Sequence, residues 1–230
     1  MKKIKILLFI LISVAFFACK DESGDYATQL YTDTELVVGI KDCLYVSMDT
    51  ANAHLAVTNG FFLYNDKGYR LHLPTATQFM IDSLYTINQV ANVDTLILHL
   101  NGIVEKSGGL FKTYFNQQIR TMTIANPSQL VSAGGTSITD YYTSAQKLAV
   151  IDLLKPQLEA RMTIGGFYND WQAVLTDFTD HFGTPAVYVD FSADITRQAV
   201  ESMLKEMAKE ELLIRKDSTH RVRISMNIFK

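Results

Sequence analysis

One acidic side chain falls where a helix would bury it. The run from Ala193 to Asp217 has helical periodicity, and at 100° per residue five of its apolar side chains share one face: Ile195, Ala199, Met203, Met207 and Ile214. Glu210 points within this apolar face, and Glu206 lies at its edge. A carboxylate on a buried face must be paired, protonated or at the mouth of a cavity, because an isolated buried charge is strongly unfavourable. Glu210 is therefore the first candidate for chemistry.

Two interpretations of Glu210 remain open from the sequence. In the first, Glu210 or its neighbour Glu211 acts in a pocket, as a general acid or base or as the ligand of a cation. In the second, the carboxylate forms a buried ion pair with a basic residue of another helix, for example Lys41 or Arg120. Buried pairs of this kind often serve only the architecture.

Other catalytic or ligand-binding patterns are absent from the sequence. The five histidines have no i, i+4 pair and no His-Glu-x-x-His motif: His54, His72, His99, His181 and His220. A zinc site needs three or four convergent ligands, so we expect no metal. There is no Gly-x-Ser-x-Gly elbow, and the glycines at 134–135 lack the lysine of a phosphate-binding loop. The sequence assigns no catalytic residue and predicts no cofactor.

The amino-terminal segment carries a second, better-defined chemistry at Cys19. Lys2, Lys3 and Lys5 precede a nearly unbroken apolar run, which ends in Ala18 followed by Cys19. The apolar run is shorter than the roughly 20 residues that span a bilayer, and its composition is typical of a signal sequence. Its end resembles a bacterial lipobox, in which the cysteine is acylated and becomes the new amino terminus. We therefore expect residues 1–18 to be a lipoprotein signal peptide and Cys19 to be lipidated.

This anchor predicts where the protein resides. Residues 19–31 would be the lipid anchor and a short polar tether, and residues 32–230 a single helical domain. Lys20-Asp21-Glu22 also resembles the surface-export signal of Bacteroidetes lipoproteins. We expect a protein of the bacterial cell envelope, held by its lipid in the outer membrane and facing the periplasm or the cell surface. The remaining cysteine, Cys43, lies on an apolar helix face, where we expect a buried, inert thiol.

The composition excludes some partners. Hydrophobic residues make up 48% of the chain, with only 4 prolines and 12 glycines, as in a globular protein rather than a disordered one. Loss of the three lysines of the signal peptide would change the formal net charge from −3 to about −6. Nucleic-acid-binding proteins have a basic excess or a basic stripe, and this chain has neither. The membrane and an unknown protein or small molecule remain as partners.

The periodicity predicts a mainly α-helical fold. Helical spacing begins after Thr32-Asp33-Thr34-Glu35, which can cap a helix, and recurs through most of the chain up to Asp217. Two stretches differ. Phe61–Leu73 has apolar and aromatic runs on either side of a turn that contains Gly68, which favours a small β-hairpin. The tail from Arg221 to Phe229 alternates with the period of a strand.

Several short motifs, in this order and spacing, resemble those of one family. They are Gly39-Ile40-Lys41-Asp42, Asn59-Gly60-Phe61, Leu73-Pro74, Met122-Thr123, Gly134-Gly135-Thr136, Asp140-Tyr141-Tyr142 and the run from Ala208 to Asp217. The chain resembles the bacterial domain-of-unknown-function family 4197, which comprises exported proteins of the Gram-negative envelope. The resemblance implies a helical envelope protein and assigns no activity, cofactor or catalytic residue. The tail and residues 164–190 depart from the family pattern.

Taken together, these features favour a lipid-anchored envelope protein that is not an enzyme and that binds or scaffolds a partner. Two alternatives remain. One is an envelope hydrolase that uses a carboxylate such as Glu210 in a cleft. The other is a carrier of a small apolar ligand, which requires an enclosed cavity of several hundred cubic ångströms.

Overall fold

The computed structural model describes residues 31–230, apart from the side chains of residues 65–67. The predicted signal peptide, Cys19 and the predicted tether up to residue 30 lie outside the described residues. Residues 31–230 form one compact unit, which is mainly helical and in which no β-strand occurs. No helix within residues 31–230 combines the length and the apolar character that crossing a membrane requires.

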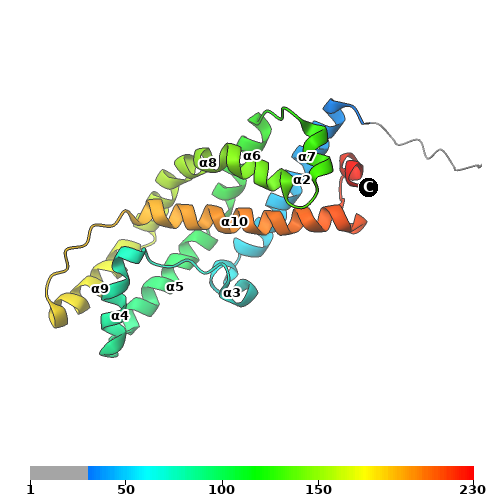
Figure 1. The fold of residues 1–230 in the computed structure, drawn as a ribbon. Coiled ribbons are helices and arrows are strands. Elements are labelled where there is room, and N and C mark those ends of the chain that lie inside the picture. The colour runs from blue at the N-terminus through cyan, green and yellow to red at the C-terminus, as the bar shows by residue number, and fades with distance from the viewer. Residues whose placement is uncertain (1–30) are drawn as a thin grey trace, which may run out of the picture. The chain divides into compact units, whose positions relative to one another are not determined.

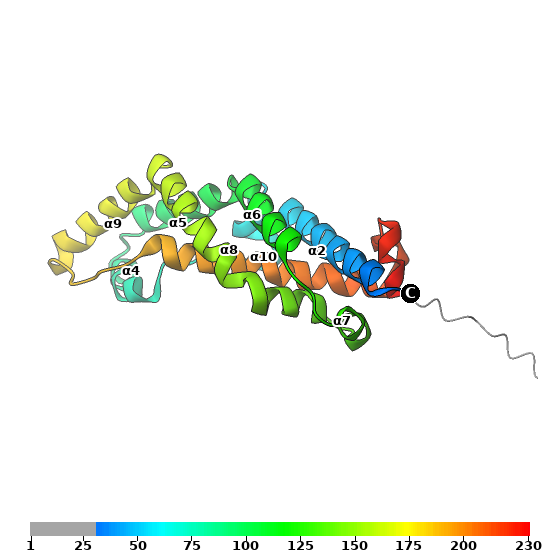
Figure 2. The same ribbon diagram turned by 90° about the horizontal axis from the view of Figure 1, so that it is seen from above.

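Helix α10 (Phe191–Lys216) is the element against which the other long helices pack. It lies against α2 (Asp33–Leu55) and α8 (Ser137–Ile164), as Figures 1 and 2 show. The predicted apolar face of α10 is buried in this arrangement: Ile195, Ala199, Met203, Met207 and Ile214 are all fully covered. Burial of each large apolar side chain stabilises the fold by about 1.5–3 kcal/mol, so the spacing of these residues explains the central place of α10.

The remaining helices are distributed along the length of α10 (Figure 1). At one end, α5 (Ala91–Glu105) and α4 (Gln78–Thr86) pack on α9 (Phe167–Phe182). Over the middle of α10, α6 (Gly108–Thr121) packs on α2 and α8, and α7 (Pro127–Ala133) packs on the same two helices nearer the carboxy-terminal end of α10. The short helix η1 (Thr75–Thr77) leads into α4.

Local sequence signals fix several helix ends. Thr32 caps the start of α2, within the predicted capping segment, and forms a capping box with Glu35: the hydroxyl of Thr32 accepts from the amide of Glu35, and the carboxylate of Glu35 accepts from the amide of Thr32. Pro127 is the first residue of α7. Pro156 lies inside α8 and does not end it.

The predicted hairpin at 61–73 is wrong. Residues Gly60–Lys67 form helix α3 instead, and the chain then runs without regular structure to Pro74. This extended stretch pairs with side-chain amides rather than with a second strand. Asn101 of α5 bonds the amide and carbonyl of Leu71, and Gln198 of α10 does the same for His72. Two helices thus satisfy the backbone groups that a sheet would otherwise satisfy.

The predicted strand in the carboxy-terminal tail is also wrong. The tail forms the 3₁₀ helix η3 (Ile224–Phe229), and a shorter 3₁₀ helix, η2 (Ser218–His220), precedes it. A strand with the alternation of this tail would place Val222, Ile224, Met226 and Ile228 on one face, but Met226 and Ile228 are buried, whereas Val222 and Ile224 are exposed. Helix η3 packs on α2 at Gly39, where an added Cβ would lie 2.4 Å from Cδ1 of Ile228. The tail thus packs on helix α2, and the described residues contain no strand with which it could pair.

Candidate functional site

Glu210, the carboxylate on the buried face of α10, lies beside a pocket. Glu210 is 6% exposed, and Nδ1 of His220 in η2 lies 2.8 Å from Oε1 of Glu210. The pocket, of about 430 Å³, has a wall from α2 and a wall from the tail: Val46, Asp49, Thr50, Ala53, Glu210, Thr219, His220, Val222 and Arg223. We call it the Glu210 pocket. It brings together an acid and an imidazole next to open space.

The other two residues singled out with Glu210 have structural contacts elsewhere. Glu211 is fully buried, and its oxygens accept from the amides of Ile138 and Thr139, at 3.1 and 2.7 Å. These amides belong to the first turn of α8, where a negative charge is favourable. Glu211 also accepts from Nε of Arg215 at 2.9 Å.

Lys41 donates to the carbonyl oxygen of Arg120 at 2.8 Å and so joins α2 to α6. Among the described side chains, the basic group within ion-pair distance of Glu210 is His220, and neither Lys41 nor Arg120 is that close. The structure therefore brings Glu210 to a pocket and places Glu211 and Lys41 in separate contacts between helices.

Glu206, one turn before Glu210, forms a closed network with aromatic and basic side chains. Its Oε1 lies 2.8 Å from Nδ1 of His54 and accepts from the hydroxyl of Tyr64 at 3.1 Å. Its Oε2 accepts from the hydroxyl of Tyr69 and from the ammonium of Lys209, the latter at 3.2 Å. The four partners come from α2, α3, the stretch that follows α3, and α10 itself. We call this set the Glu206 cluster.

The electrostatics of the Glu206 cluster follow from burial and hydrogen bonding. Burial alone would raise the pKa of the Glu206 carboxyl, but the hydrogen bonds from Tyr69, His54 and Lys209 outweigh burial, and its pKa lies below the ordinary value. Burial and the bond to this carboxylate raise the pKa of the Tyr69 hydroxyl, and the same causes raise that of Tyr64. Glu206 is therefore ionised at neutral pH, and both tyrosines are protonated donors.

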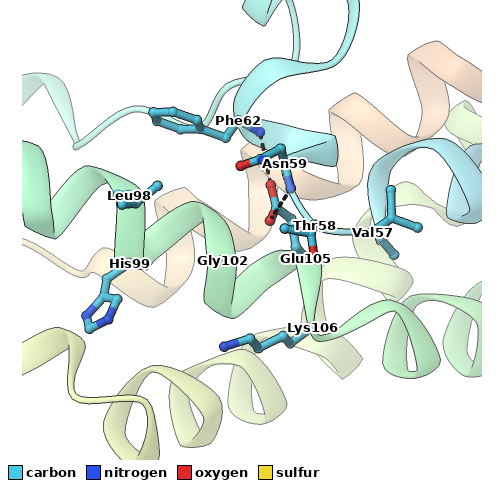
Figure 3. A pocket seen from close by; sticks show the side chains of 10 residues that line it. Val57, Thr58, Asn59, Phe62, Leu98, His99, Gly102, Glu105 and Lys106 are labelled. Atoms are coloured by element: carbon cyan, nitrogen blue, oxygen red, sulfur yellow. Dashed lines mark hydrogen bonds between the residues drawn. The ribbon is translucent and has the colours of Figure 1, made fainter.

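A further pocket, of about 550 Å³, lies between α5 and the turn that joins α2 to α3 (Figure 3). Its lining residues are Ala56, Val57, Thr58, Asn59, Phe62, Leu98, His99, Gly102, Glu105 and Lys106. Figure 3 shows Phe62 along its upper edge, His99 and Lys106 along its lower edge, and Gly102 between them. We call it the Gly102 pocket. It is open to solvent, because Leu98 and Lys106 are exposed.

The acid in the Gly102 pocket is engaged with the backbone. Glu105, 7% exposed, accepts from the amide of Asn59 at 3.0 Å and from the amide of Phe62 at 3.1 Å (Figure 3). Both amides lie at the start of α3, whose first four N–H groups need acceptors from outside the helix. Glu105 thus caps α3 across space and holds one wall of the pocket against α5.

Other groups with potential chemistry are less favourably placed. Cys43 is fully buried, as predicted, and burial raises the pKa of its thiol, which makes the thiol a poor nucleophile. Within residues 31–230, no three His, Cys, Asp or Glu side chains converge in a way that could hold a metal ion.

The sequence does not single out the Glu206 cluster or the Gly102 pocket. The partners of Glu206 lie 152, 142 and 137 positions away in the chain, at His54, Tyr64 and Tyr69, so no local pattern encodes them. One signal was present for Glu105: it follows the apolar residues Leu96, Leu100 and Val104 on the buried side of α5. An acid in that position needs a partner, as Glu210 does.

Comparison with known proteins gives one result. No curated protein and no solved structure matches the chain significantly. A family model does match it, over residues 30–229, and that family is described as a protein of unknown function. This match spans nearly all of the residues described above and agrees with the motifs found in the sequence. The chain belongs to the domain-of-unknown-function family 4197.

Proposed function

We propose that the protein is a lipid-anchored protein of the bacterial cell envelope that binds a small ligand and does not transform it. The anchor is Cys19, after a signal peptide that comprises residues 1–18, and the outer membrane is its site. The tether runs to residue 31, and residues 32–230 are the binding domain. Basic residues, an apolar run and Ala18-Cys19, in that order, support the anchor.

Metabolic labelling with an alkyne fatty acid, followed by membrane fractionation, tests the anchor. We expect label and membrane association in the wild type and the loss of both in Cys19→Ala. Cys43→Ala is the matched control, because Cys43 is the other cysteine of the chain and lies buried in the fold. Label that persists in Cys19→Ala would contradict the proposal.

The observation that carries the binding function is the Gly102 pocket. Its volume, about 550 Å³, lies in the range of small-molecule sites, roughly 300–1,000 Å³. Its one acid, Glu105, already accepts two backbone hydrogen bonds and cannot serve as a free general base without releasing α3. The pocket therefore offers space and orienting groups, and no free carboxylate for proton transfer.

Native mass spectrometry of the protein released from membranes in a mild detergent tests ligand binding. We expect a small-molecule adduct on the wild type that is missing from Gly102→Leu, a variant in which a side chain fills the pocket. Gly109→Leu is the control, because an added Cβ also meets open space at Gly109 and that residue lies outside the pocket. An adduct of equal abundance on all three proteins would place the ligand elsewhere, and its absence from all three would contradict the binding function.

The Glu210 pocket favours a second candidate, an envelope hydrolase. Glu210 has an imidazole at 2.8 Å and a space of about 430 Å³ beside it, as an acid–base site would need. Digestion of peptidoglycan and of phospholipid vesicles by the wild type, Glu210→Gln and Glu201→Gln distinguishes the two. Turnover that is lost only in Glu210→Gln would establish the hydrolase, whereas no turnover in any of the three supports binding. Glu201 is the control because it is on the same helix and outside the pocket.

A carrier of a small apolar ligand is a further alternative. It would enclose its ligand, whereas the Gly102 pocket is open and has His99 and Lys106 at its edge. We therefore favour a ligand that is bound at the surface of the domain and has a polar group as well as an apolar part.

A further inference from the structure

The floor of the Gly102 pocket is a glycine that the fold itself does not require. A Cβ added at Gly102 would meet no atom within 4 Å. At Gly108, by contrast, an added Cβ would lie 2.4 Å from Cβ of Ala56, so close packing requires that glycine. Glycine in a helix interior is destabilising by roughly 0.5–1 kcal/mol relative to alanine. The space over Gly102 is therefore maintained at a cost in stability that no internal contact explains.

The walls of this pocket include apolar side chains that remain in solvent. Leu98 is 51% exposed and Val57 is 48% exposed, and Phe62 is also part of the lining, on the side of Leu98 (Figure 3). Apolar groups that gather around a hollow typically mark a binding site. They would cover the non-polar part of a ligand that lies over Gly102.

Among the described side chains that line the pocket, Lys106 is the cation without an acidic partner. The negative charge of Glu105 faces the start of α3, whose amides and dipole offset it. His99 lies 2.7 Å from Asp170. Lys106 is exposed, and no carboxylate among the described side chains lies within ion-pair distance of it. The guanidinium of Arg70, which is not part of the lining, lies 4.3 Å from the centroid of the Phe62 ring, at the opposite edge of the pocket from Lys106.

We infer that the Gly102 pocket binds a small organic anion, a carboxylate with a short apolar body. The carboxylate lies against the ammonium of Lys106, and the apolar body covers Gly102 between Leu98 and Phe62. This inference rests on the proposal that the domain binds a small ligand, and it adds the site and the chemical class.

Three probes that share a phenylalkyl chain and differ in their terminal polar group test the inference: 4-phenylbutyrate, 4-phenylbutanol and 4-phenylbutylamine. Binding to the full-length mature protein, held in nanodiscs of zwitterionic lipid, is measured by ligand-observed saturation-transfer NMR, with empty nanodiscs as the blank. We expect the carboxylate to bind at least about 10-fold more tightly than the amine, with the alcohol between them.

Two variants, each with a matched control, separate the roles of space and charge. Gly102→Leu should abolish binding of all three probes, and Gly109→Leu should leave it unchanged. Lys106→Gln should weaken only the carboxylate, by about 3- to 5-fold, as expected for one partly exposed charge. Lys205→Gln, which removes a cation over the ring of Tyr69 and outside the pocket, should have no effect. Thermal unfolding of Gly102→Leu checks that the variant folds.

The outcomes distinguish this inference from the proposed function. Equal affinity for the amine and the carboxylate, lost in Gly102→Leu, would overturn the anionic class and leave the binding function intact. Carboxylate binding that survives Gly102→Leu would overturn the site. If no probe binds and the native protein also carries no adduct, both the inference and the binding function are contradicted.

Discussion

Glu206 and Glu210 lie one turn apart on α10, and each lies 2.8 Å from Nδ1 of a histidine, yet their surroundings differ. Glu206 faces His54, Tyr64, Tyr69 and Lys209, so both of its oxygens are engaged. Glu210 faces His220 and the Glu210 pocket. The same residue type on the same helix thus occupies a closed network in one place and an open site in the other.

The difference lies in acceptor capacity. An ionised carboxylate has about four acceptor positions, and the Glu206 cluster supplies four donors. Such a group holds segments together but has no lone pair to offer a ligand. Glu210 retains unused capacity next to a pocket, which is the condition for binding or acid–base chemistry. Burial alone therefore does not distinguish these two carboxylates, whereas the number of their hydrogen-bond partners does.

Replacing Glu206 should produce the largest effect. In Glu206→Gln, the amide N–H₂ group is a donor, and it faces the hydroxyls and the ammonium that donate hydrogen bonds to the carboxylate in the wild type. Breaking a buried charged network typically costs about 3–5 kcal/mol, and the partial exposure of Lys209 and His54 reduces this toward about 3 kcal/mol. Urea unfolding measures the loss, with Glu201→Gln as control. A loss below about 1 kcal/mol would show that the Glu206 cluster is not a closed network.

The two tyrosines of the cluster should rank by burial. Tyr69 is 2% exposed and Tyr64 is partly buried. Tyr69→Phe leaves one acceptor position of a buried carboxylate empty, so we expect the free energy of unfolding to fall by about 2 kcal/mol. For Tyr64→Phe we expect a fall of about 1 kcal/mol, because water can replace the hydroxyl. The same urea titrations give both values. Equal losses would mean that solvent reaches both positions alike.

The sequence encodes one of these two sites better than the other. The apolar face of α10 is visible because its residues recur with the period of one helix, and Glu210 interrupts that recurrence. Glu206, at the edge of the face, has partners that only the folded chain brings near. Tertiary contacts also outweighed the local pattern at 61–73. There Asn101 and Gln198 take the place of the partner strand with which Leu71 and His72 would pair in a hairpin. The Gly102 pocket needs the α2–α3 turn against α5, and no single segment contains that information.

Acid should weaken the closed network specifically. The pKa of Glu206 in the folded protein lies below its ordinary value of about 4.3, so its ionised form stabilises the fold at neutral pH. This contribution is complete above the ordinary value and is lost as the pH falls through the folded value. Urea midpoints between pH 6 and pH 3 should therefore fall more steeply for the wild type and Glu201→Gln than for Glu206→Gln. Parallel slopes in all three would contradict the assignment.

Replacing Glu210 should have the smallest effect on stability. In Glu210→Gln, the amide oxygen still accepts from His220, and the pocket beside it admits water to the remaining groups, so we expect a loss of about 1 kcal/mol or less. A double-mutant cycle with His220→Ala gives the coupling of this pair, which we expect to be about 0.5 kcal/mol. The corresponding cycle of Glu206→Gln with Tyr69→Phe should give about 1–2 kcal/mol. A coupling between Glu210 and His220 as large as that of the Glu206 cluster would make Glu210 a second structural carboxylate. The Glu210 pocket would then lose the free acceptor on which the hydrolase candidate depends.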